Sequence, residues 1–219
     1  FPDFGNTWVK PSGAIRDCVQ LQKLCRDIQE LVRRETGHSA FIAIDQEGGI
    51  VTRLKEDGVN VPGAMALGAT GDPENAYKAG LLIGREMRAL GPNFNFAPTV
   101  DVNANRGNPV IGVRSYSDDP NVVAQFATQS VRGLLEGGVL CTAKHFPGHG
   151  DTDVDSHLGL PRVEKTLEEL EALLETAGGF CTGKVLQNRH TPDPHSFIGE
   201  GKALEVKMLV EATQSTMVV

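Results

Sequence analysis

One fourteen-residue stretch, Lys144 to His157, constrains the fold and the chemistry of this chain more than any other. It reads Lys-His-Phe-Pro-Gly-His-Gly-Asp-Thr-Asp-Val-Asp-Ser-His and holds three of the six histidines in the 219-residue chain. A buried strand would not tolerate so many ionisable groups, and Pro147 with Gly148 would break a helix. We therefore expect a loop with a chemical role.

The segment directly before this stretch, from Val139 to Ala143, is apolar and has the length of a buried strand. Lys144 and His145 would therefore leave the C-terminal end of that strand. In α/β folds, active sites lie at this end of the sheet. We expect both side chains to belong to a site.

Helix and strand signals alternate along the first two thirds of the chain. Caps and apolar periodicity predict helices over 17–37, 73–91 and 120–136, and short apolar runs predict strands over 41–44, 94–97 and 139–143. Strands joined by helices lie parallel, so the class is α/β. Polar residues follow each strand, which fits a (β/α) barrel with its site on one rim and fits an open doubly wound sheet equally well.

Composition argues against several functional classes. The formal net charge is −7 and no basic stripe is present, which argues against nucleic acid as a partner. No apolar stretch has the length of a membrane span, and the first residues lack the basic start and apolar centre of a signal peptide. The four cysteines are scattered, which we interpret as a sign of a reducing compartment.

Asp155 and His157 form the clearest candidate for catalysis. They are two residues apart in a segment without helical period, so in extended backbone their side chains point the same way. A carboxylate bonded to an imidazole fixes its tautomer and prepares the ring to give and take a proton. The alternative is a pair of solvated loop residues.

A second group of polar residues follows the strand predicted over 41–44. Asp45-Gln-Glu-Gly-Gly49 begins at its C-terminal end, and Arg53 comes soon after. Carboxylates and glycines in this position indicate a site. Arg53, Arg114 and Lys144 are best explained as hydrogen-bond donors to a polar ligand, although any one of them taken singly is more often a surface charge.

Two patterns that suggest metal or nucleotide binding lack the necessary context. His145 and His149 have the spacing of metal ligands on a helix, but Pro147 and Gly148 prevent a helix there. Gly178–Lys184 nearly matches a phosphate-binding loop, but Val185 replaces the hydroxyl residue that holds magnesium and no strand precedes the loop. We expect neither a metal nor a cofactor.

Three motifs together resemble the bacterial glycoside hydrolases of family 3, in particular their NagZ-type β-N-acetylglucosaminidases of peptidoglycan recycling. The motifs are Ala43-Ile-Asp-Gln-Glu-Gly-Gly49, Pro109-Val-Ile-Gly-Val-Arg-Ser115, and Lys144-His-Phe-Pro-Gly-His-Gly150 followed by Asp155-Ser-His157. The similarity runs from about Ile15 to about Leu173. It implies a TIM-type barrel in a cytoplasmic, retaining enzyme that removes N-acetylglucosamine from muropeptide fragments.

The resemblance also implies roles for single residues. His157 would be the general acid and base, and Asp155 its partner in a dyad on a mobile loop. Near neutral pH, an imidazole can act as the acid in the first step of a retaining reaction and as the base in the second. The residues that would bind the hydroxyls and the N-acetyl group of the sugar are Asp45, Arg53, Arg114, Lys144 and His145.

The chain departs from the family pattern at three points. Ile50 stands where family members usually have arginine. The first residue is not methionine, and we expect the first barrel strand to be absent. A retaining enzyme also needs a nucleophile, which the family supplies as an aspartate on a later strand. Asp193 is the only later aspartate and lies between two prolines, so we assign no nucleophile.

The C-terminal part resembles a different family. The segment from Gly183 to Lys202, with the helix and the Ser-Thr-Met-Val-Val219 ending that follow, is similar to the start of HflX-type ribosome-associated GTPases and contains none of their GTP-binding motifs. We expect a helix over 164–176 near the junction. The predicted domains are a truncated family 3 barrel over 1–173 and a short α/β fragment over 174–219.

These observations predict an incomplete TIM-type (β/α) barrel with the activity class of a β-N-acetylhexosaminidase, impaired because the nucleophile is missing. The expected ligand is a small carbohydrate that contains N-acetylglucosamine, with no nucleic acid and no membrane as partner. The alternative is a non-catalytic sugar-binding or ribosome-associated module in a chimeric chain.

Overall fold

The computed structural model describes residues 15–54, 57–153, 165–176, 179–188 and 198–218. The chain divides into two compact units, Phe1–Val163 and Glu164–Val219, and each is described by itself. Within the described ranges, none of the helices combines the length and the apolar character that a bilayer span requires.

The first unit is built on a parallel sheet of three strands in the order β1-β2-β3. The strands are β1 (Ala43–Ile44), β2 (Phe94–Asn95) and β3 (Leu140–Cys141). Ala43 is in register with Phe94, and Phe94 with Leu140. This arrangement confirms the α/β class with parallel strands, while the incomplete barrel stays a prediction.

The regular strands are shorter than predicted, and asparagine side chains supply hydrogen bonds to the backbone on both sides of β1. The side-chain oxygen of Asn93 accepts from the backbone N–H of Ile42 at 2.8 Å, and that of Asn95 accepts from the backbone N–H of Gln46 at 3.0 Å. The regular pairing covers two residues of each strand.

The three long helices of this unit lie where the capping signals predict them. They are α2 (Cys18–Thr36), α4 (Glu74–Leu90) and α5 (Pro120–Glu136). Asp17 accepts a hydrogen bond from the backbone N–H of Gln20 at the start of α2, and Asp119 accepts from that of Asn121 at the start of α5. Gly37, in the left-handed region with φ 76°, ends α2.

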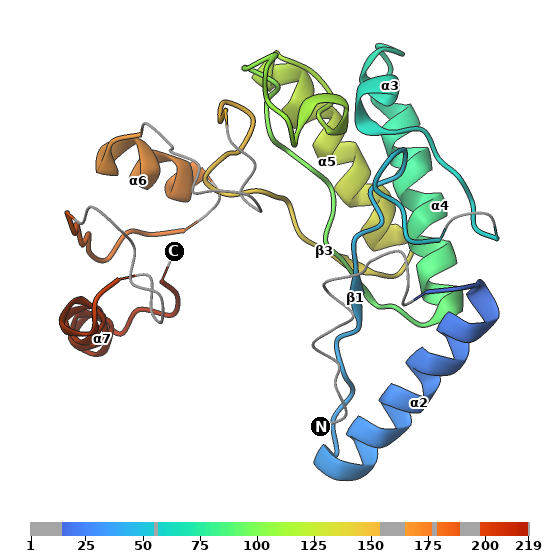
Figure 1. The fold of residues 1–219 in the computed structure, drawn as a ribbon, viewed down its shortest axis with the longest axis horizontal. Coiled ribbons are helices and arrows are strands. Elements are labelled where there is room, and N and C mark those ends of the chain that lie inside the picture. Colours follow the sequence, from blue (N-terminus) through green and yellow to red (C-terminus); the bar gives the residue numbers. More distant parts are fainter. Residues whose placement is uncertain (1–14, 55–56, 154–164, 177–178, 189–197, 219) are drawn as a thin grey trace. The chain divides into compact units, whose positions relative to one another are not determined.

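The main core forms where α4 and α5 lie side by side (Figure 1). Glycines allow the two helices to approach closely: a methyl group added to Gly80 would lie 2.5 Å from the carbonyl oxygen of Ser130, and one added to Gly133 would lie 2.2 Å from that of Tyr77. The buried side chains of this contact are Ala76, Ala79, Ile83, Met87, Val123, Phe126, Ala127 and Leu134.

Two short helices were not predicted. They are α3 (Ala64–Gly68) and the 3-10 helix η2 (Gly112–Arg114). Gly68 at the end of α3 packs directly on the backbone of Tyr116, where a side chain would lie 2.0 Å from the carbonyl oxygen. This close contact fixes α3 beside the segment that carries Arg114.

The second unit contains α6 (Leu167–Thr176) and α7 (Glu200–Thr213). Helix α6 matches the helix predicted over 164–176. Lys184 forms ion pairs with Glu168 and Glu171 of α6. None of the described residues in this unit is buried.

The close packing of α4 and α5 predicts that Gly133→Ala is destabilising, although alanine is the better helix former. The added methyl group would force the helices apart, and we expect the free energy of unfolding to fall by about 1–3 kcal/mol. Thermal unfolding followed by circular dichroism measures this. Gly201→Ala in α7, where nothing lies within 4 Å of the added carbon, is the control. Equal unfolding midpoints for wild type and Gly133→Ala would contradict the close approach.

Candidate active site

The candidate site lies at the C-terminal ends of the three strands. Its side chains come from the segments that follow β1 (Asp45–Gly49), β2 (Thr99–Asn103) and β3 (Lys144–Thr152), and from η2. Since the strands are parallel, these segments meet at one edge of the sheet. Gly48 and Gly49 have φ values of 93° and 58°, which favour glycine and turn the chain back after β1.

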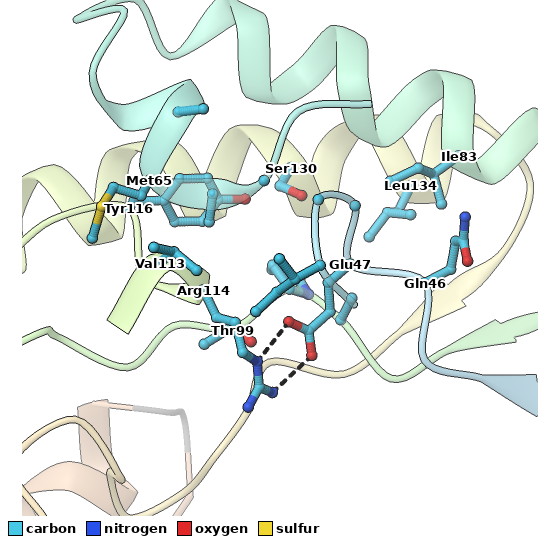
Figure 2. A pocket seen from close by; sticks show the side chains of 18 of the residues that line it. Gln46, Glu47, Met65, Ile83, Thr99, Val113, Arg114, Tyr116, Ser130 and Leu134 are labelled. Atoms are coloured by element: carbon cyan, nitrogen blue, oxygen red, sulfur yellow. Dashed lines mark hydrogen bonds and ion pairs between the residues drawn. The ribbon is translucent and has the colours of Figure 1, made fainter. Parts of the chain in front are cut away.

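Glu47 connects the positive side chains of the site. Its carboxylate accepts two hydrogen bonds from Arg114, with Nε at 3.0 Å and Nη2 at 2.8 Å (Figure 2). It also lies 2.6 Å from Nζ of Lys144. The Glu47 side chain is only 8% exposed. Burial opposes ionisation, but the hydrogen bonds and charges of Arg114 and Lys144 outweigh it and lower the pKa of Glu47.

Asp45 is the more accessible carboxylate of the site, with 32% of its side chain exposed. It lies 2.9 Å from Nζ of Lys144 and 3.4 Å from Nη2 of Arg53. Burial again opposes ionisation, but the hydrogen bonds and charges of Lys144 and Arg53 prevail and lower the pKa of Asp45. Asp45 therefore presents an ionised hydrogen-bond acceptor to a ligand at this edge.

Asp101 holds the loop that follows β3. Its carboxylate accepts from the backbone N–H of His145 at 3.1 Å and of His149 at 2.6 Å, and it lies 2.6 Å from Nδ1 of His145. Burial opposes ionisation of Asp101, but His145 and the backbone N–H of His149 outweigh it and lower its pKa. An ionised Asp101 cannot donate, so Nδ1 of His145 carries the proton. The other ring nitrogen of His145 lies 3.5 Å from Nη2 of Arg114.

The structure brings the five predicted sugar-binding residues together. Asp45, Arg53 and Lys144 form one connected ionic group, which Glu47 extends to Arg114. His145 joins through its contact with Arg114. The five residues are Asp45, Arg53, Arg114, Lys144 and His145. Their contacts support a common site, and their roles in binding stay predictions.

The predicted catalytic dyad, Asp155 and His157, lies outside the described residues, as does Asp193. Asp101 and Glu47 were not among the side chains to which the sequence assigned a role, although Glu47 lies in a segment predicted to form part of a site. A signal for Glu47 was present, because it follows Asp45 by two residues in the same glycine-rich segment after β1. Its partners, Arg114 and Lys144, lie far away in the chain, so the sequence of that segment could not identify them.

His149, whose spacing from His145 suggested a metal ligand, is buried, and its Nε2 has no hydrogen-bond partner. Its Nδ1 lies at hydrogen-bond distance from the hydroxyl of Thr152, and its ring lies 6.0 Å from that of His145, centroid to centroid. Among the residues that the structure describes, no group of three or more histidine, cysteine, aspartate or glutamate side chains is arranged to hold a metal ion.

A parallel α/β sheet with charged side chains at its C-terminal edge is the general plan of many enzymes. Residues 5–176 match the model of the glycosyl hydrolase family 3 N-terminal domain. This match covers most of the chain, so the chain belongs to glycosyl hydrolase family 3. Residues 164–219 match a second model, the N-terminal segment of GTP-binding GTPases.

Relatives with this similarity include named hexosaminidases. The chain is 44% identical to beta-hexosaminidase A of Pseudoalteromonas piscicida over 161 residues, which are 71% of this chain and 27% of the relative. It is 52% identical to a family 3 β-N-acetylglucosaminidase from Paenibacillus sp. str. FPU-7, with a TM-score of 0.68 over 71% of this chain and 30% of that structure.

A third relative is NagZ from Neisseria gonorrhoeae, with 36% identity and a TM-score of 0.63 over 72% of this chain and 46% of that structure. The chain thus spans less than half the length of each of these three relatives.

The buried Glu47 predicts a specific pH dependence for Glu47→Gln. The folded-state pKa of Glu47 is lowered, so its ionised form stabilises the fold above the ordinary value of 4.5, and this contribution is lost as the pH falls through the folded-state pKa. We expect Glu47→Gln to cost about 3 kcal/mol at pH 7, because Arg114 and Lys144 lose a buried counter-charge. The difference from wild type should shrink in acid.

Urea unfolding at a series of pH values measures this difference. The control is Glu30→Gln on the exposed side of α2, which should match wild type at every pH. A cost for Glu47→Gln that stays constant from neutral to acidic pH would contradict the ionised, paired state of Glu47.

Proposed function

We propose that the first unit is the sugar-binding part of a retaining β-N-acetylhexosaminidase that acts on peptidoglycan fragments containing N-acetylglucosamine. The observation that carries this proposal is the connected ionic group of Asp45, Arg53, Glu47, Lys144 and Arg114 at the C-terminal edge of the sheet. The names of the hexosaminidase relatives support the substrate class. We place the protein in the cytoplasm and propose an incomplete (β/α) barrel.

Charged donors and acceptors in fixed positions suit recognition of a sugar. Asp45 is ionised and partly exposed, so it accepts hydrogen bonds from sugar hydroxyls. Lys144 and Arg53 flank it and donate to hydroxyl or carbonyl oxygens. His145 carries its proton on Nδ1, and its Nε2 lies 3.5 Å from Nη2 of Arg114, so its ring supports Arg114 at the edge of the site.

The chemical step of the proposed reaction would use His157 and Asp155. In the first half-reaction His157 gives a proton to the leaving oxygen while a nucleophile attacks the anomeric carbon, and in the second it takes a proton from the water that releases the sugar. No residue of the printed sequence is assigned as the nucleophile. We therefore propose that this chain alone binds the sugar and turns it over poorly or not at all.

The match of residues 164–219 to a GTPase N-terminal segment supports a second candidate function. In this alternative, an HflX-type segment makes the chain a sugar-binding or ribosome-associated module without catalysis. Co-sedimentation with ribosomes that survives moderate salt, and that disappears when residues 180–219 are removed, would favour it. The formal net charge of −7 argues against it, because ribosome binding depends largely on phosphate contacts.

The sugar-binding proposal predicts saturable binding of N-acetylglucosamine that depends on Asp45. Asp45→Asn removes the charge of the accepting group and leaves its shape, and we expect at least about tenfold weaker binding, since a charged hydrogen bond contributes about 1.5–3 kcal/mol. Titration calorimetry measures it. Asp118→Asn, at an exposed position outside the ionic group, is the matched control. Equal affinities for the two variants would contradict the proposed role of Asp45.

Turnover is tested with 4-nitrophenyl N-acetyl-β-glucosaminide. We expect release of 4-nitrophenol by the folded wild-type chain to stay close to background, because protonation of the leaving group does not replace nucleophilic attack. Clear release that His157→Ala abolishes would support the dyad and would contradict the proposed lack of a nucleophile.

A further inference from the structure

A cavity of about 480 Å³ lies directly beside the Glu47–Arg114 ion pair, between the loop after β1 and the helices α3, α4 and α5 (Figure 2). This volume is within the range of small-molecule sites in proteins. Most of its wall is apolar. The side chains that form the wall include Ala64, Ile83, Ala97, Tyr116 and Leu134.

The cavity offers no free charge to a ligand. Among the described residues that line it, only Glu47 and Arg114 are charged, and their two hydrogen bonds pair them with each other. A charged ligand would have to be desolvated without gaining a counter-charge, which is costly. The cavity therefore selects uncharged molecules.

The entrance of the cavity is apolar. Ile50, Met65 and Val113 come from three separate segments, and all three line the cavity. They are also exposed to solvent, with exposed fractions of 75%, 37% and 50%. Large apolar side chains that gather in solvent at one opening indicate a surface that binds an apolar group.

One polar group in the wall is unsatisfied. Thr99 lines the cavity and is 3% exposed, and its hydroxyl has no hydrogen-bond partner. A buried hydroxyl without a partner is costly, and a single hydroxyl group on a bound ligand would provide one. The wall thus combines a large apolar area with one place for a hydrogen bond.

We infer that this cavity is a binding site for a small, uncharged and mainly apolar molecule with one hydroxyl group, of the class of alkyl or aryl alcohols. It differs in chemistry from the ionic sugar site beside it, of whose charged side chains only Glu47 and Arg114 line the cavity. Binding to it requires no glycosidase activity, so its test stands apart from that of the proposed function.

The test uses the full chain and the primary alcohols ethanol, butan-1-ol and hexan-1-ol, with affinities measured by ligand-observed NMR titration. Burial of each added methylene predicts a rise in affinity of roughly fourfold. Ile50→Asp and Met65→Asp place a charge at the entrance, and each should lower the affinity for hexan-1-ol at least about tenfold. Leu135 on α5 is 52% exposed and does not line the cavity, so the control variant Leu135→Asp should bind hexan-1-ol with the affinity of the wild type.

A second pair of variants examines the hydroxyl of Thr99. Thr99→Val keeps the shape of the side chain and removes its hydroxyl, so it should lower the affinity for hexan-1-ol several-fold. Thr99→Ser keeps the hydroxyl and should bind hexan-1-ol more tightly than Thr99→Val does. Circular dichroism checks that each variant is folded. Affinities that do not rise along the alcohol series, or equal effects of Ile50→Asp and Leu135→Asp, would overturn the inference.

Discussion

The candidate site depends on one buried carboxylate. Glu47, from the loop after β1, binds Arg114 of η2 and Lys144 of the segment after β3, so it joins three parts of the chain that are distant in sequence. Without its negative charge, the cationic side chains would repel one another in a partly buried place. Asp101 acts in a similar way, because it holds the ring of His145 and the backbone of the loop after β3.

The helices could be predicted because their signals are local. Asp17, Gly37 and Asp119 act within one turn of the helix ends that they define, and each is found in the predicted place. Strand lengths depend on more distant partners. The side chains of Asn93 and Asn95 replace backbone hydrogen bonds across the sheet, and no pattern within a single strand reveals such a replacement.

The candidate site could be predicted in part for the same reason. Asp45, Lys144 and His145 follow strands directly, and their position indicates a common edge of the sheet. The role of Glu47 could not be predicted, because its partner Arg114 lies 67 residues away and the pairing exists only in the folded chain. The cavity beside this pair is also a product of packing, since its walls come from α3, α4, α5 and η2 and from the segments after β1 and β2.

The central claim is that the ionic group around Asp45 and Glu47 is the place where the sugar binds. The most direct measurement is an NMR titration of the ¹⁵N-labelled chain with N-acetylglucosamine, followed by assigned amide shifts. The account predicts the largest shifts at the C-terminal edge of the sheet, in Asp45–Gly49 and around Lys144 and His145. Shifts confined to residues 179–218, or no saturable shift at all in a folded chain, would contradict it.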